Sequence, residues 1–172
     1  MNNVIFMLCL TAIFTLTGCK IKDDHRDTIN CSGIVRTDML WWDTCLTDAW
    51  RDALVEGAEM TLPVDSVELL KLYGMVDIWI PNHPEIDDLI PLKDMPWITL
   101  VNITGTKIDD LGPLKHVTSL MQLFCDSTDV KDISPLYGLR DLWRVCLGDS
   151  VPMDQIRRLR DQQGVDVVCP IL

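Results

Sequence analysis

Few residues in this sequence could carry out acid–base or nucleophilic chemistry, and their spacing predicts no pairing of a nucleophile with a base. The histidines are His25, His83 and His116, and none is spaced to face a cysteine or a serine on one predicted strand. A catalytic nucleophile needs a base within hydrogen-bond reach, so no such pair is predicted. The sequence also lacks a glycine-rich phosphate-binding loop. It therefore predicts a protein that is not an enzyme and that holds no cofactor.

Carboxylate pairs are a second group that could do chemistry. Asp87–Asp88 and Asp109–Asp110 recur at a spacing of 22 residues. A pair that recurs at a structural period is better explained by helix capping and solvation than by general acid–base catalysis. No two cysteines have the Cys-x-x-Cys spacing of a zinc site, so no metal site is predicted.

A third kind of chemistry, lipid attachment, is indicated near the N-terminus. Residues 2–18 carry no charged side chain and have the length of a signal-peptide apolar core, too short to span a bilayer comfortably. The run ends in "LTGC", residues 16–19, which resembles the lipobox of bacterial lipoproteins. The resemblance implies cleavage before Cys19 and acylation of that cysteine, including palmitate. The alternative is an ordinary signal peptide with a cysteine there by chance.

The same resemblance implies a location in the cell envelope. Three acyl chains would hold the protein on a membrane far more firmly than one, since each buried methylene contributes ~0.8 kcal/mol. Lys20, not aspartate, follows Cys19. In enteric-type sorting this favours the outer membrane, on its periplasmic or its surface side.

Net charge limits the partners. The formal charge of −11 lies entirely beyond residue 18. An acidic surface repels phosphate, so a nucleic-acid partner is not expected, and no small-molecule substrate is evident.

Four segments organise the chain: a signal peptide over 1–18, a polar flexible tether over 19–30, an N-terminal cap over 31–61 and a repeat domain over 62–172. Within the cap, the spacing of Leu46, Trp50 and Leu54 predicts a helix. Asp43 or Thr44 would cap this helix and Gly57 would end it.

Apolar residues recur every 22 residues beyond Met60, as in "KIDDLGPLKHVTSL" (107–120) and "DVKDISPLYGLRDL" (129–142). We number positions in each repeat from Met95 as position 1. No single repeat can bury its apolar positions, but stacked repeats bury them as one core. The expected core positions are 4 (Val76, Ile98, Leu120, Leu142), 7 (Trp79, Val101, Leu123, Val145), 14 (Ile86, Ile108, Val130), 17 (Leu89, Leu111, Ile133) and 20 (Leu92, Leu114, Leu136), with Val64, Val67, Leu70 and Tyr73 as a half-repeat before them.

This pattern predicts an α/β solenoid of short parallel strands on a concave face and short helical or 3-10 segments on the convex face, with a small helical N-terminal cap. Aspartates at position 16 can cap each returning helix, and prolines at position 19 fit its first turn. Hydroxyls at position 12 can satisfy backbone groups of the neighbouring turn. Position 16 is held by Asp88, Asp110 and Asp132, position 19 by Pro91, Pro113 and Pro135, and position 12 by Thr106, Thr128 and Ser150.

The repeats resemble the leucine-rich repeats of internalins, in which "DISPL" closes each unit. "DLIPL", "DLGPL" and "DISPL" occur here, and the resemblance covers residues 62–172. The family's asparagine at position 12 is absent, and Pro84 stands there in the first repeat. After Ser150 the pattern predicts a slip of one residue, a slightly longer helix and a last strand in "GVDVVC".

Side chains at positions 6, 8 and 10 should point out of the concave face, with positions 3 and 5 at its edge. Apolar residues flanked by tryptophan and arginine there have the composition of a protein-binding site. The alternative is that the N-terminal cap or a second subunit covers them. The predicted binding residues are Ile80, Leu100, Asn102, Gln122, Phe124, Trp143, Arg144 and Asp126.

Two disulfides are hypothesised. Cys31 and Cys45 bracket a short segment of the cap, and Cys146 and Cys169 share position 8 once the slip is counted. Neighbouring strands lie ~4.8 Å apart, within the reach of a disulfide. Cys125 would then stay free.

The function expected from these features is that of a membrane-anchored lipoprotein whose repeat domain binds a protein. Acidic charge with apolar anchors favours a basic partner. An immunity-like inhibitor of a basic envelope toxin would fit. The alternative function is structural, that of an envelope-assembly or secretion-system pilot lipoprotein.

Overall fold

The computed structural model describes residues 39–168. The predicted signal peptide (1–18), the tether (19–30) with Cys19, and residues 31–38 of the predicted cap lie outside the described residues, as does Cys169. Within residues 39–168, no helix is long and apolar enough to cross a membrane.

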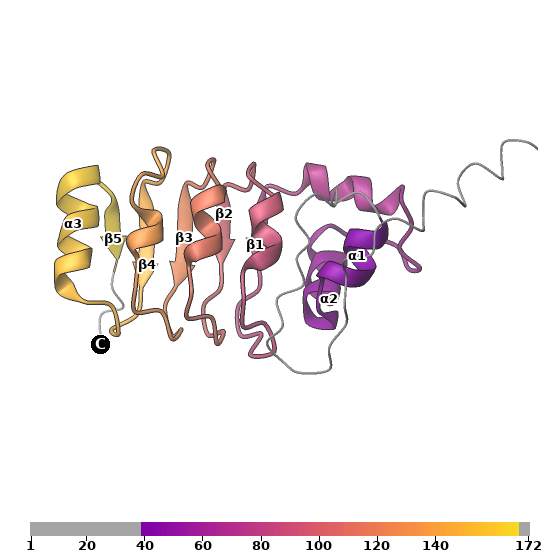
Figure 1. The fold of residues 1–172 in the computed structure, drawn as a ribbon, viewed down its shortest axis with the longest axis horizontal. Coiled ribbons are helices and arrows are strands. Elements are labelled where there is room, and N and C mark those ends of the chain that lie inside the picture. The colour runs from indigo at the N-terminus through magenta and orange to yellow at the C-terminus, as the bar shows by residue number, and fades with distance from the viewer. Residues whose placement is uncertain (1–38, 169–172) are drawn as a thin grey trace, which may run out of the picture. The chain divides into compact units, whose positions relative to one another are not determined.

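Five short parallel strands form one sheet and lie side by side in chain order (Figure 1). Each strand pairs with the strand of the next repeat, so every repeat contributes one strand. This is the α/β solenoid that the period predicts. The strands are β1 (Asp77–Trp79), β2 (Leu100–Asn102), β3 (Gln122–Cys125), β4 (Arg144–Leu147) and β5 (Asp166–Val168).

Helical segments return the chain from one strand to the next and lie on one side of the sheet (Figure 1). Most are single 3-10 turns with proline in the first turn, where no hydrogen bond of the helix is lost. They are η1 (Glu68–Gly74), η2 (Ile90–Asp94), η3 (Gly112–His116), η4 (Ser134–Leu136) and the α-helix α3 (Met153–Gln163).

The aspartates at position 16 lie one residue before the N-caps of these turns, Leu89, Leu111 and Ile133, and their side chains bond the first amide of each turn. Oδ1 of Asp88 accepts a hydrogen bond from the amide of Ile90 at 2.7 Å, and Oδ1 of Asp110 accepts one from the amide of Gly112 at 2.6 Å. Asp132 makes the same bond in the next repeat. Each bond satisfies an amide that the short helix leaves without a partner.

The hydroxyls at position 12 act within their own repeat. Thr106 Oγ1 donates to the carbonyl of Ile103 at 2.7 Å, and Thr128 Oγ1 donates to that of Cys125 at 2.6 Å. They therefore close the turn that follows their own strand. The predicted bond to the neighbouring turn is not made by Thr106 or Thr128.

The core is a stack of apolar side chains between the sheet and the returning segments. The core residues of β2 and β3, Val101 and Leu123, are fully buried. From Ile86 onward, positions 1, 14, 17 and 20 are buried wherever an aliphatic or methionine side chain holds them. The period therefore builds one continuous core from units that could not each bury their own.

The register of the first repeat differs from the prediction. Asp77 lies opposite Leu100 and Ile78 lies opposite Val101, a spacing of 23 residues. Five residues separate Ile80 from Ile86, whereas four separate Ile103 from Ile108, so the extra residue lies in the loop that contains Pro84.

Everything before that loop is therefore displaced by one position. Position 4 is held by Met75, not Val76, and position 7 by Ile78, not Trp79. In η1, Leu69 and Leu72 are buried. The side chains predicted as the core of this half-repeat are exposed instead: Val67 at 70%, Leu70 at 55% and Tyr73 at 46%.

The last repeat also differs from the prediction, because it lacks the one-residue slip that the sequence pattern predicted. Helix α3 and strand β5 form as expected, with Ile156 and Leu159 buried. However, Cys146 lies opposite Val168, which keeps the spacing at 22 residues. The predicted slip is wrong, because the longer α3 replaces a 3-10 turn without shifting the strand that follows.

Two helices, not one, precede the repeats: α1 (Met39–Cys45) and α2 (Asp48–Gly57). Thr47 is the N-cap of α2 and its hydroxyl accepts from the Trp50 amide, so neither Asp43 nor Thr44 starts this helix. Gly57 ends it as predicted. Trp50 is buried and its indole donates to the Asp88 carbonyl at 3.1 Å. That these helices cap the solenoid remains a prediction.

Candidate functional site

The candidate site is the side of the sheet that faces away from the helical segments. We call it the strand face and define it by repeat positions 5, 6, 8 and 10. Position 6 is held by Asp77, Leu100, Gln122, Arg144 and Asp166, and position 8 by Trp79, Asn102, Phe124, Cys146 and Val168. Because successive residues of a strand point to opposite sides, positions 6 and 8 project from the sheet while position 7 enters the core. Position 5 directly precedes each strand and is included because Met121 and Trp143 are exposed there.

Large apolar side chains on this face are exposed. Trp79 is 64% exposed, Trp143 is 42% and Met121 is 41%. Phe124 and Leu100 are half-buried. Single exposed apolar residues are common, but a set gathered over adjoining strands indicates an interaction surface.

Arg144 is held over this surface by two contacts. Its Nη2 lies 3.0 Å from Oδ2 of Asp166 on the next strand. Its guanidinium carbon also lies 4.7 Å from the centre of the Trp143 ring. An arginine stacked on an aromatic ring and paired with a carboxylate keeps a defined orientation.

Asp126 stands at the far end of β3 and is also held by a neighbouring repeat. Its Oδ1 accepts a hydrogen bond from Thr104 Oγ1 at 2.8 Å. Gln122 and Asp126 are both half-buried on the face. Across positions 5 to 10 of the described strands, the charged residues are Asp77, Asp126, Asp166 and Arg144, so the face is acidic.

Two predicted binding residues do not fit this role. Ile80 is 2% exposed, because the 23-residue spacing of the first repeat turns it into the core. Asn102 is on the outward side, but it is 7% exposed and its Oδ1 accepts from the Thr104 amide at 3.0 Å. Asn102 therefore shapes the end of β2 and offers little surface to a partner.

Trp79 is the residue that the sequence prediction missed. The unbroken 22-residue period puts it in the core, whereas the structure makes it the most exposed aromatic side chain on the strand face. The sequence carries one sign of the shift, the five residues between Ile80 and Ile86, but loop length alone does not say which side of the sheet Trp79 faces.

Cys125 is not a reactive thiol. Cys125 is a free, buried thiol that donates to the Cys146 carbonyl at 3.3 Å. Burial raises the pKa of this thiol far above its usual range, and the charges of Cys146 and Asp126 add to the effect. A thiol that stays protonated is a poor nucleophile.

The disulfide hypotheses stand as predictions. Cys45 is disulfide-bonded, but Cys31 lies outside the described residues. The Cys146–Cys169 pair assumed a slip that the β4–β5 register lacks, and Cys169 also lies outside the described residues.

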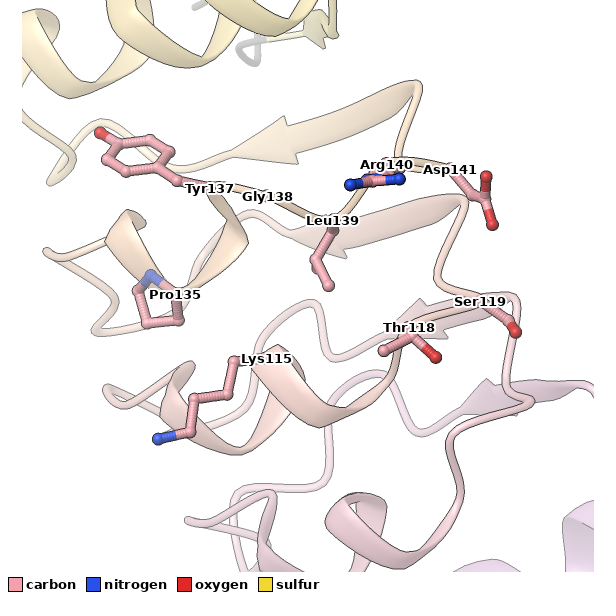
Figure 2. Close-up of a pocket in the computed structure, with 9 residues that line it drawn as sticks. All are labelled: Lys115, Thr118, Ser119, Pro135, Tyr137, Gly138, Leu139, Arg140 and Asp141. Carbon is pink, nitrogen blue, oxygen red and sulfur yellow. The ribbon is translucent and has the colours of Figure 1, made fainter.

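A hollow of about 450 Å³ lies between the third and fourth repeats, on the turns that enter the strands (Figure 2). Lys115 and Arg140 line it, but Figure 2 shows these two cations at opposite ends of the hollow, with the apolar side chain of Leu139 between them. A ligand site needs polar groups that converge, so the hollow is a weaker candidate than the strand face. In the part of the chain that is described, no cluster of three metal-ligating side chains occurs.

Comparisons with known proteins place the fold. No protein-family model matches the chain, and no curated protein matches it. Among solved structures, internalin C2 from Listeria monocytogenes matches with a TM-score of 0.60 and 18% identity, over 70% of this chain and 53% of that one. An internalin, inlF, from the same organism matches with a TM-score of 0.52 and 15% identity, over 70% of this chain and 42% of that one.

These similarities show that the chain has an internalin-like leucine-rich-repeat fold. The chain spans about half the length of the internalins that it matches. At such low identity the similarity concerns the fold alone, so function has to be argued from the strand face.

Proposed function

We propose that this chain is a protein-binding leucine-rich-repeat module that captures its partner on the strand face. The observation that carries the proposal is the exposure of Trp79, Met121 and Trp143, in the repeats of β1, β3 and β4, on one acidic face. Aromatic side chains and arginine dominate the binding energy of protein interfaces when a partner excludes water from them. Arg144, already stacked on Trp143, fits that description.

The partner that fits this face is basic. The chain carries a formal net charge of −11, and carboxylates outnumber cations on the strand face. Opposite charge raises the rate of encounter, while buried apolar anchors slow dissociation. An immunity-like inhibitor of a basic envelope toxin has these properties.

The proposal includes a membrane anchor. The lipobox-like "LTGC" at 16–19 and the polar tether after it support lipidation of Cys19 and attachment to the outer membrane. A lipid-anchored binding module would meet basic proteins that cross or enter the envelope. A structural role, as an assembly or secretion-system pilot lipoprotein, is the second candidate and rests on the same anchor.

The test is affinity capture from envelope extracts with matched variants. Full-length protein should retain a basic protein that Phe124→Ala and Trp143→Ala variants lose, each substitution costing ~2 kcal/mol or more of binding energy. Leu70→Ala is the control, because Leu70 is 55% exposed but lies in η1, away from the strand face. If the Leu70 variant loses the partner while the other two keep it, the strand face is not the site.

A further inference from the structure

The exposed side chains of the strand face form two rows that run across the strands. The first is position 5, where backbone bonds join Val76 to Thr99 (2.7 Å), Thr99 to Met121 (2.8 Å) and Met121 to Trp143 (3.0 Å). The second is position 8, which is held by Trp79, Asn102, Phe124, Cys146 and Val168, with Asn102 buried and the large side chains at Trp79 and Phe124. Both rows therefore follow the stack of repeats.

The position 5 side chains border the outward face and do not turn away from it. Thr99 Oγ1 lies 3.3 Å from Oδ1 of Asp77, a position 6 residue of the preceding repeat. Trp143 lies beneath the guanidinium of Arg144, which also holds position 6. Position 6 therefore lies on the same face, between the two rows.

The dimensions of this surface match an α-helix. Positions 5 and 8 are separated by three residues, or ~10 Å along a strand, which equals the diameter of a helix with its side chains. Along each row the backbone positions recur every ~4.8 Å, the spacing of neighbouring strands. A helix repeats its apolar stripe every ~5.4 Å, whereas an extended chain repeats its same-side residues every ~6.6 Å. The helix is the closer match.

We infer that the occupant of the strand face is an amphipathic α-helix with lysine or arginine along its flanks, lying across the strands between the two rows. This inference rests on the proposed function and names the kind of partner segment. The apolar stripe of the helix would contact Leu100 and Phe124, and the basic flanks of the helix would face Asp77 and Asp126. About 13 helical residues would span the five strands.

Charge selects this occupant over an acidic or neutral helix. Asp166 is paired with Arg144, whereas Asp77 at the β1 end and Asp126 beside β3 each accept a hydrogen bond from a threonine hydroxyl, a neutral donor that leaves the negative charge uncompensated. The exposed Asp77 side chain is a hydrogen-bond acceptor that solvent or a partner can reach. A lysine or arginine from the helix would complement both.

The experiment uses full-length protein in dilute non-ionic detergent and fluorescence anisotropy, with detergent alone as the blank. Three labelled peptides of about 14 residues are compared. The first places leucines at helical spacing with lysines on the flanks. The second has the same composition with leucine and lysine alternating. The third is the first with every lysine replaced by glutamate. We expect the basic helical peptide to bind at least ten-fold more tightly than either other peptide.

Single substitutions test whether the basic helical peptide binds to the strand face. Trp79→Ala removes an exposed side chain without disturbing the core, and we expect it to weaken binding of the basic helical peptide several-fold. Phe124→Ala should weaken it at least ten-fold. Asp77→Asn should lower the dependence of affinity on salt, and Leu70→Ala should change nothing.

Each contrary outcome is informative. If the alternating peptide binds as well or better and is sensitive to Phe124→Ala, the helix geometry is wrong while binding by the strand face survives. A preference for the acidic peptide refutes the charge assignment. If no peptide binds, or binding ignores both aromatic substitutions, the helix inference is overturned, and the envelope capture experiment alone decides the proposed function.

Discussion

Trp79 on β1 lies directly opposite Asn102 on β2, although 23 residues and not 22 separate them along the chain. This single extra residue decides which side chains of the first repeat reach solvent. It exposes Trp79 and buries Ile80, its neighbour in sequence. The first prediction tests that relationship.

Ile80→Ala should destabilise the protein, whereas Trp79→Ala should not. Ile80 is 2% exposed and its truncation leaves a cavity, which typically costs ~2–5 kcal/mol. Trp79 is 64% exposed, and substitutions at such sites usually change stability by about 0.5 kcal/mol or less. Urea unfolding measures both. Equal losses would show that the first repeat follows the 22-residue spacing after all.

Asp110→Ala should destabilise the second repeat, whereas Asp109→Ala should have little effect. Asp110 accepts from the amide of Gly112 and starts η3. Loss of a comparable cap costs ~0.5–2 kcal/mol. Asp109 is exposed and is the matched control, because it carries the same charge one residue earlier. Thermal unfolding of the two variants distinguishes capping from a general effect of charge.

Cys125 should make the protein less stable at alkaline pH. Burial raises the pKa of its thiol in the folded state, while the unfolded thiol titrates near ~8.5. Below that pH both states hold the proton and stability is unaffected. Above it the unfolded state loses the proton first, so the free energy of unfolding falls by up to ~1.4 kcal/mol per pH unit.

Urea unfolding at several pH values between 7 and 10 measures this slope, and Cys125→Ala provides the reference for all other titrating groups. The variant should show a shallower decline by about the amount attributed to one thiol. Identical slopes in both proteins would mean that the thiol is accessible in the folded state.

Cys19→Ser should abolish membrane attachment. If Cys19 carries the lipid, the variant accumulates as an unprocessed or soluble form, because no acyl chains are added. Labelling of cells with a radioactive fatty acid checks this, and the wild-type protein should take up the label. An unlabelled wild-type protein would refute the lipoprotein assignment.

Peptide mapping without reduction should find Cys45 in a disulfide and Cys125 as a free thiol. Cys45 is disulfide-bonded and Cys125 is buried and free in the structure. The sequence predicts Cys31 as the partner of Cys45. A fragment that links Cys125 to any other cysteine would contradict both the core packing and the predicted pairing.

The sequence by itself determined the repeat architecture. A period of 22 residues can persist in apolar positions only if each repeat meets its neighbours in the same way, so the parallel sheet, the capped returning turns and the core of Val101, Leu123 and Val145 could be predicted without coordinates. The outward positions of Leu100, Phe124 and Arg144 followed from the alternation of side chains along a strand.

The tertiary structure alone decided the register of the first repeat. A one-residue shift reverses the direction of every side chain in a strand. In the first repeat either register would bury an apolar side chain, because Trp79 and Ile80 are adjacent. Local pattern could not separate the two alternatives. The backbone pairing to β2 did so, because the extra residue of the Pro84 loop is absorbed where the chain leaves β1, and the strand keeps its register with the sheet.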